Sequence, residues 1–250
     1  MFGLLVLKLN NMDSDEQYDF DKLRSQFRMF NWFQKRYLRK HFGRQKAKEW
    51  TREAKEQFDI LLPDLPYIGN KEYYFTRFLV MTAMLTPMTK TLHEEGIIER
   101  EVGKMIFDLA ESFYKIIPSF IRHRQGKKLF TPESKEIWKQ RCKESQERQI
   151  PFDWACEYIE GEEGDNFDYG FNMTKCGNVE YWKEQGLSQY VPYLCLCDWP
   201  GWKANNVEAS RTKTLAQGDE YCDFRYIRYG KNGLRGWPPE TLEEWKKRKI

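Results

Sequence analysis

Residues 151–174 read PFDWACEYIEGEEGDNFDYGFNMT, and this stretch decides the fold class of the chain. Two short runs rich in aromatic and β-branched residues, 152–159 and 167–174, flank the polar segment GEEGDN at 161–166. Apolar runs on both sides of a glycine-containing turn segment predict a β-hairpin. The pattern changes at Pro151, because the residues before it have helical periodicity instead.

Short segments continue after the hairpin. We expect helices at 179–185 (closed by Gly186) and 192–204, strands at 207–216 and 220–229, and a turn at Gln217-Gly218-Asp219. The order strand, strand, helix, helix, strand, strand predicts an antiparallel sheet with helices on one face, which is an α+β fold. Residues 234–250, with Trp237-Pro238-Pro239, are expected to form a packed tail with a loop and a short helix.

The first 150 residues are expected to be helical and to pack on this sheet. Apolar residues at three- and four-residue steps predict helices at 20–37, 47–61, 70–96, 98–117 and from Thr131-Pro132-Glu133 onward. Asn70 is expected to cap the third helix and Pro87 to kink it. The basic segment 122–129 is interpreted as an exposed connection. The expected organisation is therefore a helical region at 1–150, an α+β domain at 151–233 and a tail at 234–250.

Composition excludes several classes of protein. Aromatic residues make up 16% and hydrophobic residues 40% of the chain, which rules out wholesale disorder. The mean hydropathy of −0.80 and the lack of a long apolar run predict no membrane-spanning helix. Residues 1–9 are apolar but lack the features of a secretory signal, so we expect a buried strand or helix start and a cytoplasmic protein. A net charge of +3 predicts no nucleic-acid partner.

Charge is distributed unevenly along the chain. Residues 19–58 contain 12 Lys/Arg against 5 Asp/Glu, whereas residues 151–200 contain 2 against 10. The two regions would attract each other across a domain interface or between the subunits of a homo-oligomer. Two solvated faces of opposite sign that never meet are an equally good interpretation.

Familiar catalytic motifs are absent from the sequence. It has no phosphate-binding glycine-rich loop, no GxSxG, no HExxH and no CxxC. His41, His93 and His123 all fall in the helical half and are expected at the surface. Of the six cysteines, Cys142 stands alone in a charged helix and the others follow Pro151. Without a secretory signal they are expected to be reduced thiols.

The cysteines and one aspartate form the candidate site. Cys176 ends a predicted strand, Cys222 begins the last one, and Cys195 lies one helical turn before Asp198. A carboxylate beside a thiol disfavours the thiolate, so activation needs a cation such as Arg211 or Arg225, or a metal. Small buried core residues are the alternative interpretation of the cysteines. Neither a metal nor another cofactor can be assigned from the sequence.

Two further groups have a structural and a functional interpretation. The acidic residues Glu160, Glu162, Glu163, Asp165 and Asp168 are interpreted as a solvated hairpin rather than as a general base or cation site. The tryptophans Trp182, Trp199 and Trp202 are interpreted as core rather than as the wall of a ligand pocket.

The C-terminal motifs resemble a known family. The resemblance is carried by YLCLCD at 193–198, RTKTLAQGD at 211–219 and CDFR at 222–225, with FDYG at 167–170, TKC at 174–176 and the segment 70–75 upstream. Together they are similar to the L-2-amino-thiazoline-4-carboxylic acid hydrolase family, most clearly over residues 160–230.

The resemblance implies a hydrolase that opens a small cyclic amidine-like substrate with water, at a C–N or C–S bond. It places Cys176, Cys195, Asp198 and Cys222 in catalysis, with a cysteine as nucleophile or metal ligand and Asp198 orienting or deprotonating water. Arg211 or Arg225 would pair with the substrate carboxylate, beside Thr212 in the substrate-binding set.

Two other interpretations stay open. Gly218, Cys222 and Phe224 also resemble the small ligand-binding domains of the vinyl-reductase type, which implies a pocket that binds a small molecule without turnover. The third interpretation is an assembly protein that uses its basic helices as an interface.

Overall fold

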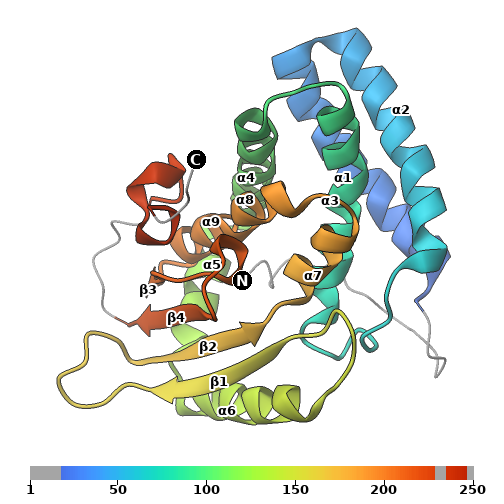
Figure 1. The fold of residues 1–250 in the computed structure, drawn as a ribbon. Coiled ribbons are helices and arrows are strands. Elements are labelled where there is room, and N and C mark those ends of the chain that lie inside the picture. The colour runs from blue at the N-terminus through green and yellow to red at the C-terminus, as the bar shows by residue number, and fades with distance from the viewer. Residues whose placement is uncertain (1–17, 229–234, 247–250) are drawn as a thin grey trace.

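The computed structural model of the protein describes residues 18–228 and 235–246, so the expectation for residues 1–9 lies outside the described residues. The α-helices of the first half are α1 (Phe20–Phe42), α2 (Arg44–Leu61), α3 (Thr76–Glu94), α4 (Glu99–Ile116), α5 (Ser119–Lys128) and α6 (Pro132–Glu147). The second half contains β1 (Ala155–Glu160), β2 (Tyr169–Lys175), α7 (Gly177–Glu184), α8 (Val191–Cys195), α9 (Asp198–Ala204), β3 (Glu208–Ser210) and β4 (Cys222–Ile227). Short 3-10 turns are η1 (Leu62–Asp64), η2 (Ser188–Tyr190), η3 (Leu215–Gln217), η4 (Pro239–Thr241) and η5 (Glu243–Trp245). The fold is α+β, as predicted (Figure 1).

The long helices α1 and α2 form an antiparallel hairpin at one side of the molecule (Figure 1). Asp19 caps α1 by accepting a hydrogen bond from the Lys22 N–H, and Gly43 has the positive φ of +87° that turns the chain into α2. Their apolar stripes face each other, with the rings of Phe27 and Phe58 stacked at 4.0 Å between centroids. The helical periodicity of the sequence therefore predicted this hairpin correctly.

Two expectations for the helical half were wrong. Asn70 does not cap α3, because its Oδ1 accepts from the Glu72 N–H in a preceding turn and the helix begins only at Thr76. The segment 122–129 is largely helical and belongs to α5. Gly126 is buried there, and a Cβ on it would come within 1.9 Å of the Asn205 carbonyl oxygen. The lack of a side chain at Gly126 thus lets α5 pack closely on the end of α9.

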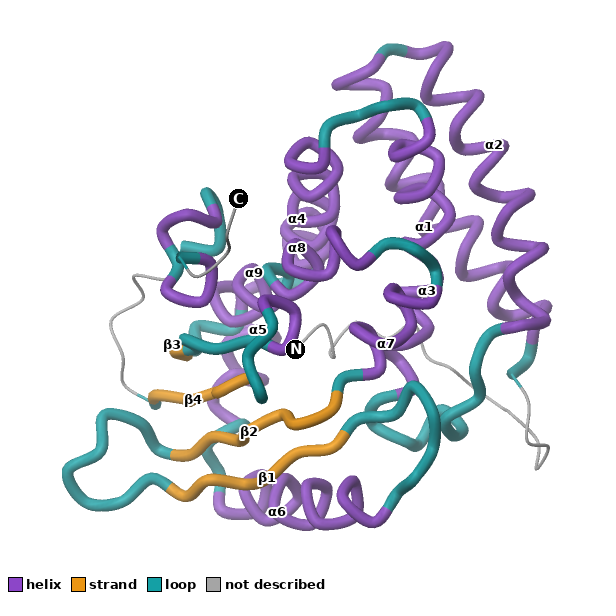
Figure 2. Tube along the Cα trace, viewed as in Figure 1, coloured by secondary structure: helices purple, strands orange, loops and turns teal. Residues whose placement is uncertain are grey.

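The four strands form one antiparallel sheet in the order β1-β2-β4-β3. Figure 2 shows α6 running beside β1 at one edge of this layer. In register, Tyr169 pairs with Tyr226 and Phe171 with Phe224, so their rings share one face. Trp138 of α6 stacks on Phe171, and Trp202 of α9 contacts Phe224 and Tyr226. These helices therefore cover the same face, as the sequence predicted.

The C-terminal half departs from expectation in two places. The helix expected at 192–204 is two helices, α8 and α9, separated by residues 196–197. The strand expected at 207–216 shortens to β3, because the N–H groups of Thr212 and Lys213 donate to the Asp223 carboxylate instead of extending the ladder. The turn around Gly218 is present, with φ +89° at the glycine.

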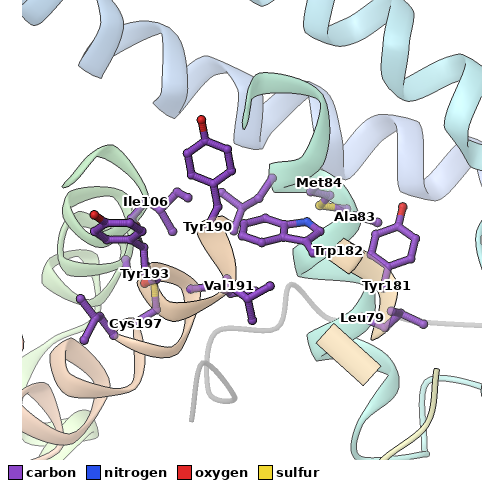
Figure 3. Packing of buried hydrophobic residues seen from close by; sticks show 14 of the residues in the cluster. Leu79, Ala83, Met84, Ile106, Tyr181, Trp182, Tyr190, Val191, Tyr193 and Cys197 are labelled. Carbon is purple, nitrogen blue, oxygen red and sulfur yellow. Dashed lines mark hydrogen bonds between the residues drawn. The ribbon is translucent and has the colours of Figure 1, made fainter. Parts of the chain in front are cut away.

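One hydrophobic core joins the two halves. Figure 3 shows side chains of α7, η2 and α8 gathered between α3 and α4, among them Trp182, Tyr190 and Tyr193. The Trp182 indole N–H donates to Thr86 Oγ1 at 2.9 Å, which satisfies a buried polar group within the packing. The tail packs here too, through Trp245 against Tyr193. None of the helices in the described ranges has the length and apolar character required to cross a membrane.

Candidate functional site

A cavity of about 120 Å³ lies between α3, α6, the covered face of the sheet and the segments that lead into α7 to α9. Its walls are mostly apolar and aromatic. The lining residues used below are Tyr74, Phe78, Trp138, Trp154, Cys176, Cys195, Asp198, Arg211 and Cys222. Apolar walls with a few converging polar groups are typical of small-molecule sites.

The candidate catalytic residues Cys176, Cys195, Asp198 and Cys222 all line this cavity. Cys176 directly follows β2 and precedes α7, and Cys222 is the first residue of β4. Cys195 ends α8 and Asp198 begins α9, so the break at 196–197 lets both reach the cavity from separate helices. Cys195 and Asp198, which were expected on one continuous helix, thus lie on two helices.

Thr212 and Arg225 do not line the cavity. Thr212 is exposed, and its N–H and hydroxyl both donate to the Asp223 carboxylate. Arg225 lies on the outer face of the sheet, where its guanidinium donates to Asn172 Oδ1 at 3.0 Å. Of the residues expected to bind substrate, Arg211 alone lies in the cavity wall.

Arg211 is held by two carboxylates. Its Nε and Nη2 donate to the two oxygens of Glu244 at 2.6 and 2.8 Å, and its Nη1 donates to Asp198 Oδ2 at 2.7 Å. Nη2 also donates to the Cys195 carbonyl at 3.0 Å. The side chains of Arg211 and Glu244 are only 1% and 2% exposed, so the pair is excluded from water. Arg211 therefore orients Asp198 and the end of α8.

Glu244 was missed in the sequence analysis. It lies in the tail turn η5, and the expectation for this tail went no further than packing. Neither spacing nor a motif connects Glu244 to Arg211, because the two are 33 positions apart. One of two adjacent glutamates in the charged segment 243–249 has no sequence signal of burial.

The thiols of the cavity are held in their protonated form. Burial raises the pKa of Cys176 to about 11 and that of Cys222 to about 12, and it also raises the pKa of Cys195 well above its ordinary value. The Asn178 and Val179 N–H groups at the start of α7 partly offset this effect at Cys176.

Asp198 differs from the thiols in its charge state. Burial alone would raise its pKa, but the Arg211 guanidinium contributes to a pKa below the ordinary value. The carboxylate is therefore ionised at neutral pH.

The other sequence candidates lie outside the cavity lining. Trp182, Trp199 and Trp202 are buried core residues, whereas Trp138 and Trp154 form the aromatic wall instead. Glu160 pairs with Lys135 and Lys139 at the surface. The three histidines are exposed, and within the described ranges no three His, Cys, Asp or Glu side chains are grouped to hold a metal ion.

Cys142 does not stand alone. Its sulfur lies 2.8 Å from that of Cys156, and both side chains are almost completely buried between α6 and β1. The Ser145 hydroxyl accepts a hydrogen bond from the Cys156 N–H and donates to the Cys142 carbonyl. This pair joins α6 to the sheet behind the cavity wall.

Comparison with known proteins gives one match. A family model described as L-2-amino-thiazoline-4-carboxylic acid hydrolase matches residues 74–226. No curated protein and no solved structure matches the chain. Tyr74 and Tyr226, the first and last residues of the matched range, both line the cavity. Glu244 lies outside the matched range.

Proposed function

The chain belongs to the L-2-amino-thiazoline-4-carboxylic acid hydrolase family, and from this premise we propose that its cavity binds and opens a small cyclic amidine-like substrate such as 2-amino-thiazoline-4-carboxylate. The observation that carries the proposal is the convergence of Cys176, Cys195, Cys222 and Asp198 on the lining of one cavity. The site also has a size suited to a small ring.

The proposed reaction is the addition of water to the ring carbon that lies between nitrogen and sulfur. The water oxygen bonds to this carbon in the protonated ring, and one water proton passes to Asp198. The carbon–sulfur bond then breaks with its electron pair on sulfur, which takes the proton of the new hydroxyl group. Asp198 releases its proton to solvent. Water and the protonated ring thus become N-carbamoyl-cysteine and a free proton.

Asp198 is assigned the role of general base because it is the ionised acceptor in a cavity of protonated thiols. Arg211 is assigned a positioning role, because its hydrogen bonds to Glu244 and Asp198 hold that carboxylate in place. In the covalent alternative the Cys176 thiol gives its proton to Asp198 and its sulfur bonds to the ring carbon of the protonated ring. The ring carbon–sulfur bond then breaks with its electron pair on the substrate sulfur, which takes that proton from Asp198. Water next bonds to the same carbon and gives one proton to Asp198, and the bond to Cys176 breaks with its electron pair on the Cys176 sulfur, which takes the proton of the new hydroxyl group. The α7 N-terminus favours Cys176 over the other two thiols for this role.

Incubation of the purified protein with 2-amino-thiazoline-4-carboxylate tests the proposal. Proton NMR would follow loss of the ring, and mass spectrometry would identify carbamoyl-cysteine. No turnover, either with or without added divalent metal, would refute this substrate. In the water-attack mechanism Cys176→Ser retains part of the activity. In the covalent mechanism this variant loses the activity, and the isothiourea adduct that mass spectrometry would detect on Cys176 of the wild type is absent.

A non-catalytic binding module is the second candidate function. It is favoured by the raised pKa of each cavity thiol and by the exposed positions of all three histidines. A binding module would retain the thiazoline acid unchanged, with saturable quenching of the fluorescence of Trp138 and Trp154. Turnover of the same compound would exclude this function.

A further inference from the structure

Two buried cysteine sulfurs face each other between α6 and the edge strand β1. Cys142 Sγ lies 2.8 Å from Cys156 Sγ, and the two residues are 1% and 0% exposed. Both are free thiols, and neither residue lines the cavity, so the reaction proposed above does not use them. The pair is thus a dithiol outside the proposed active site.

Hydrogen bonds between α6 and β1 hold this dithiol in place. The Cys156 N–H donates to Ser145 Oγ at 3.0 Å, and the Cys156 carbonyl accepts from Gln146 Nε2 at 2.9 Å. The Ser145 hydroxyl in turn donates to the Cys142 carbonyl at 2.7 Å. Because these bonds connect the two backbones directly, they keep the side chains of Cys142 and Cys156 opposite each other.

The two sulfurs differ in their affinity for a proton. The Cys142 S–H donates to Cys156 Sγ, and this hydrogen bond lowers the pKa of Cys156 below its ordinary value although burial acts in the opposite direction. The same bond, together with burial, raises the pKa of Cys142. The nearby Arg141 guanidinium also favours the thiolate of Cys156. Cys156 is therefore the nucleophile of the pair, and Cys142 keeps its proton.

We propose that Cys142 and Cys156 form a redox modification site, at which a peroxide converts the two thiols into a disulfide that joins α6 to β1. The Cys156 sulfur bonds to one peroxide oxygen, the O–O bond breaks, and the released oxygen takes the Cys156 proton and leaves as water. The Cys142 sulfur then bonds to the Cys156 sulfur, and the S–O bond breaks with its electron pair on oxygen. This hydroxyl takes the Cys142 proton and leaves as a second water, so two electrons pass from the sulfurs to the peroxide.

The disulfide requires little rearrangement and would affect the cavity. A disulfide bond is about 2.05 Å long, so the sulfurs must approach by about 0.8 Å. Hydrogen peroxide is little larger than water and can reach the pair during local opening of α6. Trp138 lies one turn before Cys142 on α6, stacks on Phe171 and lines the cavity. A bond between α6 and β1 therefore also restricts movement of this wall.

Peptide mapping of the full chain after exposure to dilute hydrogen peroxide tests the proposal. The remaining thiols would be alkylated under denaturing conditions, and the digest would be analysed without reductant. We expect two peptides joined through Cys142 and Cys156, lighter by two hydrogen atoms than the separate thiol peptides and released by dithiothreitol. Cys197 is the control for burial, because it is 0% exposed but its sulfur faces the carbonyls of Ile106 and Tyr193. It should remain a thiol.

Two variants test the order of attack. Cys142→Ser removes the second thiol, so oxidation of Cys156 should stop at the sulfenic acid, which dimedone traps as an adduct. Cys156→Ser should leave Cys142 as a thiol and give no adduct. The proposal is wrong if the wild type forms no disulfide between Cys142 and Cys156, or if Cys197 is oxidised as fast as the pair. Mapping of the wild type needs no substitution, so this test holds even if a variant fails to fold.

Discussion

Glu244 accepts hydrogen bonds from Arg211 through both of its carboxylate oxygens, at 2.6 and 2.8 Å, and this contact connects the C-terminal tail to the wall of the cavity. The same guanidinium holds Asp198 at 2.7 Å. Because the Arg211 and Glu244 side chains are removed from bulk water, the loss of one of them leaves the other poorly compensated. The tail is therefore part of the site although it lies outside the residues that define the family match.

Glu244→Gln is expected to destabilise the protein by about 3 kcal/mol, because it leaves the buried Arg211 with one carboxylate instead of two. Urea unfolding followed by circular dichroism measures the change. Glu243→Gln is the matched control, since Glu243 is exposed and its substitution should change the stability by less than about 0.5 kcal/mol. Equal stabilities of the two variants would contradict a stabilising role for the pair.

Local pattern in the sequence was sufficient for much of the fold. The apolar stripe of α1 and the GEEGDN turn before β2 both act over a few residues, and both elements formed as predicted. The break between α8 and α9 was not predicted, because residues 196–197 keep helical backbone angles and show no breaker. Likewise α5 is rich in basic residues and has little apolar periodicity, so its helix depends on packing of Gly126 against Asn205.

The residues of the candidate site also fall into those that local motifs predict and those that they do not. The family motifs contain Cys176, Cys195, Asp198 and Cys222, which all line the cavity. That these four residues form one site could therefore be predicted from the sequence. Glu244 acts through a partner that is distant in the sequence, and no spacing rule relates a tail glutamate to Arg211. Such pairs emerge only when the helices have been placed.

Asp198→Asn is expected to lower kcat for ring opening by about 10²- to 10⁴-fold, since it removes the proton acceptor and keeps the shape of the side chain. Steady-state kinetics on the thiazoline acid measures the effect, with thermal unfolding as the check on folding. Asp165→Asn in the exposed β1–β2 turn is the control and should behave like the wild type. A variant that keeps full activity would rule out Asp198 as the base.

The cavity thiols predict a distinctive alkaline pH dependence. Because burial raises the pKa of Cys176 to about 11, its alkylation by iodoacetamide should be slow at pH 7 and still increase between pH 9 and about 11. An ordinary thiol, with a pKa of about 8.5, has reached its plateau by then. Peptide mass spectrometry after short exposures measures the rate at each pH. A plateau below pH 9 at Cys176 would contradict the raised pKa.

The same shift has a consequence for stability. Between about pH 8.5 and the raised pKa values, the folded protein keeps protons on Cys176 and Cys222 that the unfolded chain releases. Stability from these groups is therefore complete below about pH 8.5 and is lost as the pH rises toward about 11 and 12. The free energy of unfolding of Cys176→Ser, measured with urea, should decline less steeply over this pH range than that of the wild type. Parallel declines would show that the thiol does not contribute.

Gly103 is expected to be intolerant of any side chain, because α4 packs there directly on α8. A Cβ on Gly103 would lie 2.2 Å from Cδ1 of Tyr193, and that ring is itself held against Trp245. Gly103→Ala should destabilise the protein by about 1–3 kcal/mol, although the same change in an exposed helix adds up to about 1 kcal/mol of stability.

Urea unfolding of Gly103→Ala beside Ser112→Ala, at an exposed position of the same helix, separates the clash from helix propensity. In a Tyr193→Ala background the obstructing ring is gone, so Gly103→Ala should then cost less than it does in the wild type. An equal cost in both backgrounds would mean that the contact between α4 and α8 does not limit this position. Since α8 carries Cys195, the reduced fit should also weaken binding of the thiazoline acid.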